Sequence, residues 1–361
     1  MASFAYVVHP RTAGDVARRY PLARYLPGRV LEAMLAHTGS VEIGRITGEI
    51  DPGTGIHGRA GEELEGRVIA CPLTSRQIEN MPRDQVTDRV LAAAHLARDR
   101  GAAVVGLGGA TGAVDVVAAV AGQLQVPVTG GEAGRLWAAL AAMEKLAALW
   151  GLDLDCVPAA VVGATSRAGR VIAVLLGRRV GALTLVDRPL GSVERVAAEI
   201  IQHTGLSPHV AGRLRGARPR PVVVVVAAPA AWESMQPGDI SPGTVVCDLA
   251  RPLAVSPALA GEDVLVVHGA LVTVPGVVSL PAILGLPAGT VTAGMAEVIV
   301  RALETRRYWP AAGYGVDTIS VDYMAEAARR YGFGIGGILS SGRLLDEGTI
   351  AAFGHTVSRY R

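Results

Sequence analysis

Short apolar runs alternate along the chain with longer segments in which apolar residues recur every three or four positions. In Gln85–Arg100, for example, Val86, Val90 and Ala97 fall on one face of a helix. Up to residue 150 the pattern predicts strands over 41–47, 67–71, 102–107 and 125–129, and helices over 85–100, 113–123 and 132–150. Alternation of this kind is typical of a parallel sheet that is covered by helices.

A second series begins after Gly151–Pro158, which we interpret as a domain boundary. It predicts strands over 159–162, 183–186, 222–227, 245–248 and 264–267, with helices over 168–176 and 193–204. After Pro287 the pattern predicts helices over 291–304 and 320–331 with no strand between them. We therefore predict an α/β fold with an N-terminal α/β substrate domain (1–155), a doubly wound parallel-sheet domain (156–288) and a helical C-terminal segment (289–361) that packs back on the N-terminal domain.

Composition narrows the class of protein. Half of the residues are hydrophobic and 18% are charged, which excludes a disordered chain. The formal net charge of +2 argues against nucleic acid as a partner. Three cysteines without CxxC spacing provide no disulfide framework, so we expect a cytoplasmic protein. No uninterrupted apolar run reaches the roughly 20 residues of a membrane-spanning helix, and we expect no integral membrane segment or signal peptide.

The strongest chemical signal lies in AAVVGATSRAGRVIAVLL, residues 159–176. An apolar strand ends at Gly163, and Gly169 follows on the opening turn of a helix, so backbone N–H groups at the helix start can face an anion. The next strand ends at Asp187, 24 residues after Gly163, where dinucleotide-binding folds place a ribose-binding acid. These features predict a Rossmann-type site formed by Gly163, Ala164, Thr165, Ser166, Arg167, Ala168, Gly169, Asp187 and Arg188.

The choice between NAD and NADP stays open at this point. Asp187 repels a 2′-phosphate and favours NAD, whereas Arg188 and Arg167 favour NADP.

Several segments, taken in their order and spacing, resemble the long-chain acyl-(acyl-carrier-protein) reductases of cyanobacteria and their bacterial relatives. The resemblance runs over roughly 41–335 and is carried by segments 66–74, 104–112, 126–131, 161–169, 245–252, 294–304 and 319–333. It implies a cytoplasmic enzyme that reduces a fatty acyl thioester to an aldehyde with NAD(P)H. It also implies that the N-terminal domain binds the acyl group, and that acyl carrier protein or acyl-CoA is the partner.

The resemblance also implies a cysteine nucleophile immediately before Met295-Ala296-Glu297, but this position is occupied by Gly294. The loops that the family places at the cofactor and acyl group also differ here, because they read Gly-Gly-Ala-Thr-Gly over 108–112 and Thr-Gly-Gly-Glu over 129–132. The substrate-contacting candidates are Gly108, Gly109, Thr111, Thr129, Gly130 and Gly294. Such changes indicate a different substrate or a lost reaction.

Three further residues are candidates for catalysis. Cys71 follows a predicted strand and is a substitute nucleophile, although a buried structural role fits it better. His268 follows the strand over 264–267 and is a candidate general acid, and Glu297 is a candidate for orienting a bound thioester.

Three hypotheses follow from these residues. The first is an acyl-thioester reductase. The second is an NAD(P)-dependent dehydrogenase of a small carbonyl, hydroxy or amino acid, which needs no thiol. The third is a non-catalytic relative that binds nucleotide or acyl ligand. Homo-oligomerisation is left open by the sequence.

Overall fold

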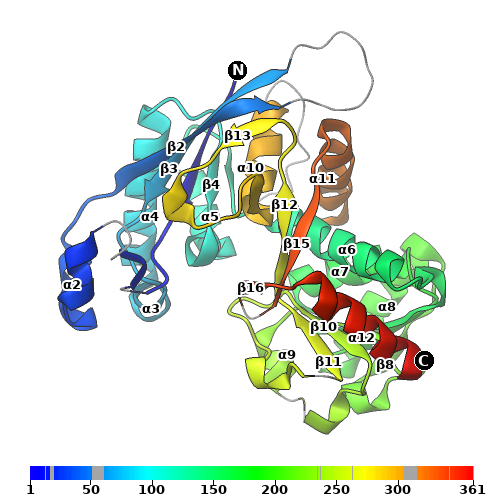
Figure 1. Ribbon diagram of the computed structural model, residues 1–361. Coiled ribbons are helices and arrows are strands. Elements are labelled where there is room, and N and C mark those ends of the chain that lie inside the picture. The colour runs from blue at the N-terminus through cyan, green and yellow to red at the C-terminus, as the bar shows by residue number, and fades with distance from the viewer. Residues whose placement is uncertain are drawn as a thin grey trace. The chain divides into compact units, whose positions relative to one another are not determined.

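The computed structural model describes all residues except 13, 17–19, 51–60, 234, 236, 262, 305–314, 341 and 361 (Figure 1). The chain forms two compact units. The first unit comprises 1–134, 272–315 and 322–334, and the second comprises 135–271, 316–321 and 335–361. The chain thus passes from the first unit to the second at residues 134 and 135, near the start of the helix predicted over 132–150.

A mixed six-stranded sheet forms the framework of the first unit. Its order is β13 (Val277–Ser279), β2 (Val41–Ile50), β3 (Glu62–Ala70), β1 (Ala2–Val8), β4 (Val105–Leu107) and β5 (Val128–Thr129). The strands from β3 to β5 are parallel to one another, whereas β2 and β13 pair antiparallel. The sequence analysis missed β1, although this strand lies inside the sheet.

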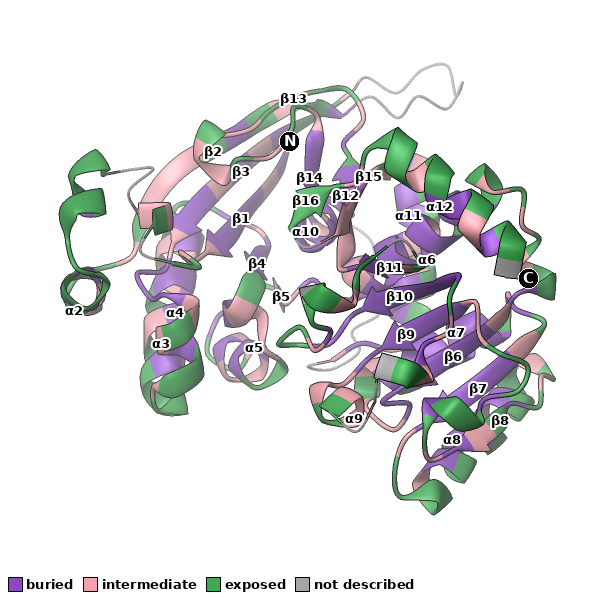
Figure 2. Ribbon diagram, turned by 60° about the horizontal axis from the view of Figure 1, so that its bottom comes forward, coloured by how far each residue is buried: buried purple, intermediate pink, exposed green. Residues whose placement is uncertain are grey.

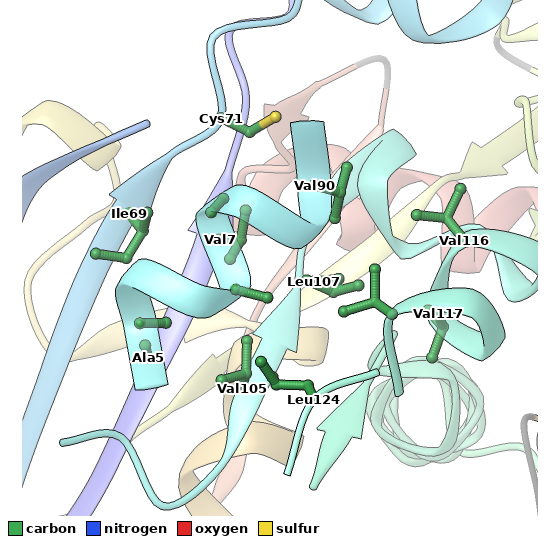
Figure 3. Close-up of a cluster of buried hydrophobic side chains, with 14 of the residues drawn as sticks. Ala5, Val7, Ile69, Cys71, Val90, Val105, Leu107, Val116, Val117 and Leu124 are labelled. Carbon is green, nitrogen blue, oxygen red and sulfur yellow. The ribbon is translucent and has the colours of Figure 1, made fainter. Parts of the chain in front are cut away.

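Strand β1 buries both of its faces. Ala5 and Val7 join a core cluster with residues of α4 (Arg83–Asp99) and α5 (Val114–Ala121), as Figure 3 shows. Phe4 and Tyr6 alternate with them and so project from the other face, where Tyr6 lies against Gly106 of β4. The same glycine contacts Val298 of α10 (Ala293–Leu303), so α10 covers this second face.

The second unit is built on a six-stranded sheet whose neighbouring strands are all parallel. Its order is β8 (His209–Ala211), β7 (Ala182–Val186), β6 (Pro158–Val162), β9 (Val223–Val226), β10 (Thr244–Asp248) and β11 (Val264–Val267). The chain therefore lays three strands outward in one direction, returns to the centre and lays three in the other. This is the doubly wound order that the sequence predicted, and it reverses between β6 and β9.

Helices join these parallel strands. Helix α7 (Arg167–Gly177) connects β6 to β7, and α8 (Leu190–Thr204) connects β7 to β8. The inner strands are almost wholly buried, as the purple colour in Figure 2 shows. This burial explains why their sequences are continuous apolar runs without alternation.

The segment after residue 289 is not helical throughout, and that prediction is wrong. A third sheet has the order β14 (Thr290–Thr292), β12 (Gly269–Thr273), β15 (Gly334–Ser340) and β16 (Arg343–Leu344). Glycines in β15 disfavour a helix. A Cβ at Gly337 would lie 2.5 Å from Cδ2 of Leu344, so the two strands of the hairpin of β15 and β16 approach closely at this glycine.

The other helices of eight or more residues in the described ranges are α2 (Gly28–Ala36), α6 (Glu132–Leu149), α11 (Thr318–Tyr331) and α12 (Glu347–Tyr360). Helix α12 packs on Trp150, whose indole N–H donates to the Ile350 carbonyl at 2.8 Å and whose ring lies 5.7 Å from that of Phe353. Within the described residues, none of the helices combines the length and the apolar character needed to cross a membrane.

Replacing Gly66 should test the packing of β1 on β3. A Cβ at this position would lie 2.3 Å from the ring of Phe4, which is buried. We expect Gly66→Ala to lower the free energy of unfolding by about 2 kcal/mol, measured by urea denaturation, because overpacking a tight core displaces its side chains. The control is Gly122→Ala, where the nearest atom to the new Cβ is 3.5 Å away. Equal stability of both variants would contradict the packing described here.

Candidate functional site

The loop after β6 is closed by two glycines and a serine. Gly163 has a φ of +82°, which favours glycine. The Ser166 hydroxyl donates to the Gly163 carbonyl at 2.8 Å and accepts from the Gly169 N–H at 3.1 Å, and it thereby caps α7. A Cβ on Gly169 would lie 2.1 Å from the Gly163 oxygen, so the loop and the helix meet without any intervening side chain.

This contact leaves the first turn of α7 at the carboxyl edge of the sheet. The N–H groups of Arg167 and Ala168 belong to that turn, which has no intrahelical acceptors for them. A helix start of this kind attracts anions through its amide groups and the helix dipole. The loop over 163–169 can therefore hold a phosphate group.

The loop also lies at the point where the strand order reverses. Gly163 follows β6, and a Cβ on it would lie 2.7 Å from Cβ of Ala228, which follows β9. Strands β6 and β9 are neighbours in the sheet. In open parallel sheets, ligands bind in the crevice at this switch point, outside the carboxyl ends of the strands.

Asp187 and Arg188 follow β7 at the same edge. One carboxylate oxygen of Asp187 accepts from the Thr165 N–H at 2.9 Å and from its hydroxyl at 2.5 Å. The other oxygen accepts from the Arg188 N–H at 2.8 Å. The sequence analysis placed Asp187 here but did not anticipate that it would be bonded to the glycine loop. The structure thus brings the predicted cofactor residues from Gly163 to Gly169 together with Asp187 and Arg188.

His268 and Asp248 lie farther along this edge. Asp248 is buried and accepts from the N–H groups of Ala250, Ala254 and Val255, so it caps the loop after β10. His268 follows β11, which is three strands from β6 in the sheet, a separation of about 14 Å at the usual strand spacing. The role of His268 as a general acid stays a prediction.

Glu297 occupies a buried position in the first unit. Its side chain accepts from the Thr129 hydroxyl at 2.5 Å, from the Gly134 N–H at 2.8 Å and from Nε of Arg301 at 2.8 Å. The residue is 1% exposed. The carboxylate therefore links α10 to β5 and to the first turn of α6. The observed hydrogen bonds are those of a structural residue, and we call this the anchoring role of Glu297.

Gly294, the position where the resemblance implies a nucleophile, lies in the first turn of α10. A Cβ on Gly131, whose φ is +73°, would lie 2.5 Å from Cα of Gly294, so the two backbones are in direct contact. A Cβ on Gly294 itself would lie 3.2 Å from the hydroxyl oxygen of Tyr6. The predicted substrate residues Thr129 and Gly130 immediately precede Gly131 in this loop.

The other predicted substrate residues line the neighbouring loop after β4. Gly108 lies against the ring and hydroxyl of Tyr6, and the buried Thr111 donates its hydroxyl to the Gly108 carbonyl at 2.7 Å. Nε2 of His9 accepts from the Ala110 N–H at 2.9 Å and would lie 2.5 Å from a Cβ on Gly109. The apolar pattern of the sequence does not predict β1, which carries Tyr6 and ends just before His9, and so it does not point to these two residues.

The three cysteines have different environments. Cys71 is buried in the cluster around Val7 and Val90 (Figure 3), and burial raises the pKa of its thiol to about 12. Cys247 lies inside β10, where burial and the Asp248 charge raise its pKa to about 12. Cys156 is exposed but lies just before β6, at the opposite end of that strand from Gly163. Cys71 and Cys247 are therefore neutral thiols at physiological pH. No cysteine lies in the loop over 163–169 or in the loops over 108–112 and 129–132.

Within the described ranges, no three His, Cys, Asp or Glu side chains gather as metal ligands would.

No protein-family model matches the chain. Among solved structures, L-tryptophan dehydrogenase from Nostoc punctiforme is 12% identical, with 91% of this chain and 79% of that chain covered and a TM-score of 0.36. The 5-ketofructose reductase of Gluconobacter sp. strain CHM43 is 14% identical, with 99% of each chain covered and a TM-score of 0.35.

The Δ1-pyrroline-2-carboxylate reductase of Thermococcus litoralis, solved with NADH and L-proline, is 17% identical. The match covers 31% of this chain and 35% of that chain, with a TM-score of 0.25. At identities and TM-scores this low, these likenesses assign no activity to the chain.

Replacing the buried carboxylate should test its anchoring role. We expect Glu297→Gln to lower the free energy of unfolding by about 3 kcal/mol, because the change removes the charge that pairs with Arg301 and replaces one of the two buried accepting oxygens with a donor. The matched control is Glu326→Gln, which removes a carboxylate that is 56% exposed and paired with Arg330. Its expected cost is below about 0.5 kcal/mol. If urea denaturation shows a similar loss of unfolding free energy for Glu297→Gln and Glu326→Gln, the anchoring role of Glu297 is wrong.

Thiol labelling should distinguish the three cysteines. We expect iodoacetamide at pH 8 to modify only Cys156 in the native protein, because the thiolate reacts and the pKa values of Cys71 and Cys247 are raised to about 12. Mass spectrometry should find one label before denaturation and three after it, and Cys156→Ser should abolish native labelling. Rapid labelling of native Cys71 would restore it as a candidate nucleophile.

Proposed function

We propose that the chain is an NAD(P)-dependent oxidoreductase whose second unit binds the dinucleotide. The observation that carries this proposal is the position of the glycine loop. The loop begins after β6, at the reversal point of an all-parallel six-stranded sheet, and leads directly into α7. The topology, the close contact of Gly163 with Gly169 and the acid that follows β7 all support the same ligand.

The residues of this unit have distinct tasks in binding. The amides of Arg167 and Ala168 would hold the pyrophosphate at the start of α7. Ser166 fixes the geometry of the loop through its bonds to Gly163 and Gly169. When bound, the nicotinamide supplies or accepts a hydride.

The substrate we propose is a small carbonyl, hydroxy or amino acid. Reduction of an acyl thioester through a covalent intermediate requires a thiolate. Gly294 offers none, Cys71 and Cys247 are buried with raised pKa values, and Cys156 is at the far end of β6. Hydride transfer that interconverts a carbonyl and an alcohol, or an imine and an amine, needs a proton donor and no thiol, so it is compatible with these residues.

An aspartate in the first turn of α7 should test the site. Ala168→Asp places a negative charge where the pyrophosphate would bind, while an acid at a helix start favours the helix itself. We expect NADH and NADPH, titrated by fluorescence, to bind at least about tenfold more weakly, which corresponds to about 1.4 kcal/mol. Thermal unfolding of the variant should stay unchanged.

The matched control is Ile319→Asp, which adds the same charge at the second position of α11, where the side chain is 63% exposed. It should bind both cofactors as the unaltered protein does. Equal binding by Ala168→Asp would place the dinucleotide elsewhere, and no binding by the unaltered protein would overturn the proposal.

The substrate class is tested on the same preparation with a panel of small 2-oxo acids, hydroxy acids and amino acids beside palmitoyl-CoA. Absorbance at the nicotinamide band reports turnover. Activity on the small substrates alone supports the proposal, whereas aldehyde formation from palmitoyl-CoA would establish the acyl-thioester reductase that the sequence resemblance implies. Cofactor binding without turnover on either set would favour a non-catalytic role.

A further inference from the structure

The carboxylate of Asp187 is largely occupied by hydrogen bonds from within the protein. Thr165 donates to one of its oxygens through both its N–H and its hydroxyl, and the Arg188 N–H donates to the other oxygen. A carboxylate offers about four acceptor positions, of which three are taken here. One position remains, so Asp187 can accept from at most one ribose hydroxyl while it keeps its bonds to Thr165 and Arg188.

Thr165 is the residue responsible for this arrangement. It stands in the loop where dinucleotide-binding sequences often have a second glycine, and glycine has no hydroxyl to donate. The hydroxyl of Thr165 bonds to the same carboxylate oxygen as its own amide, so the two donors fix the direction of the Asp187 side chain toward the loop.

Three arginines follow β7 or β8 or begin α7 at the same edge of the sheet. Arg188 is exposed, and its Nε donates to the Gly212 carbonyl at 3.3 Å, which leaves the two terminal nitrogens of the guanidinium for a ligand. Arg213 follows Gly212 and is exposed, as is Arg167 at the start of α7. The segments that follow β7 and β8 and that begin α7 therefore each carry an exposed arginine.

We propose that this site selects NADP(H) over NAD(H). Arg188 recognises the 2′-phosphate, and Thr165 is a positioning residue that holds Asp187 on the loop. This inference rests on the proposed dinucleotide site and names its cofactor. A phosphate monoester carries about −1.5 to −2 charges at neutral pH, and the planar guanidinium fork of arginine matches its oxygens. A carboxylate that is not held by Thr165 could instead turn toward the ribose and accept from its 2′-hydroxyl.

Fluorescence titration of the full chain with NADH and NADPH tests the proposal. NADPH should bind at least about tenfold more tightly than NADH, and added salt should reduce the difference because the contact is ionic. Arg188→Gln should weaken the binding of NADPH by about tenfold or more and change the binding of NADH by no more than about twofold. The control is Arg170→Gln, which removes an exposed α7 arginine that pairs with Glu199 and should change neither affinity.

Thr165→Val tests the positioning role, since valine keeps the amide and the side-chain volume but removes the hydroxyl. Without the hydrogen bond from the Thr165 hydroxyl, Asp187 gains a free acceptor position. The ratio of NADPH to NADH affinity should then fall by about fivefold or more. A simple structural role would weaken both cofactors equally and leave the ratio unchanged.

The possible results distinguish a failure of the proposed dinucleotide site from a failure of the NADP assignment. If neither cofactor binds, the proposed function fails and the specificity proposal fails with it. If both cofactors bind but NADH binds more tightly, or Arg188→Gln weakens both equally, the dinucleotide site stands and the NADP assignment is overturned.

Discussion

The second unit depends on one close contact between backbones, that of Gly169 with the carbonyl of Gly163. The missing side chain at 169 lets α7 begin directly against the loop, and the hydroxyl of Ser166 fills the remaining hydrogen-bonding positions on both glycines. Because this contact lies where the sheet reverses its order, the first turn of α7 starts at the point of the sheet where open parallel folds bind their ligands. Any side chain at 169 would separate the anion-binding helix from the strand that positions it.

The sequence predicted this unit well because its strands are buried on both faces. Runs such as Val222–Ala227, which is bounded by prolines at 221 and 229, are typical of inner strands of a parallel sheet. The same reasoning missed β1, where Ala2–Val8 mixes small, polar and aromatic residues, and it missed the glycine-rich β15. Glycine-rich strands are defined by the close approach of neighbours from distant parts of the chain, which local periodicity does not reveal.

The sequence predicts the location of candidate site residues that come directly after a strand. It does not predict their hydrogen-bond partners. The positions of Gly163, Asp187 and His268 follow from strand order, because the carboxyl ends of parallel strands share one edge. The hydrogen bonds of Thr165 to Asp187 and of Thr129 to Glu297 join residues that are 22 and 168 positions apart. Such bonds depend on side-chain rotamers, which are set only once the backbone has folded. For that reason the sequence left NAD and NADP undecided, and it left Glu297 as a candidate for catalysis.

The glycines of the first unit show that packing alone does not dictate the absence of a thiol. Gly131 has to be glycine, because its φ is positive and its Cβ would lie 2.5 Å from the backbone of Gly294. Gly294 has no positive φ, and its Cβ would lie 3.2 Å from the hydroxyl oxygen of Tyr6 and 3.7 Å from Cα of Gly131. The backbone conformation at 294 therefore does not by itself demand glycine. The glycine there is a chemical feature of this chain, which fits a reaction that proceeds by hydride transfer without a covalent acyl intermediate.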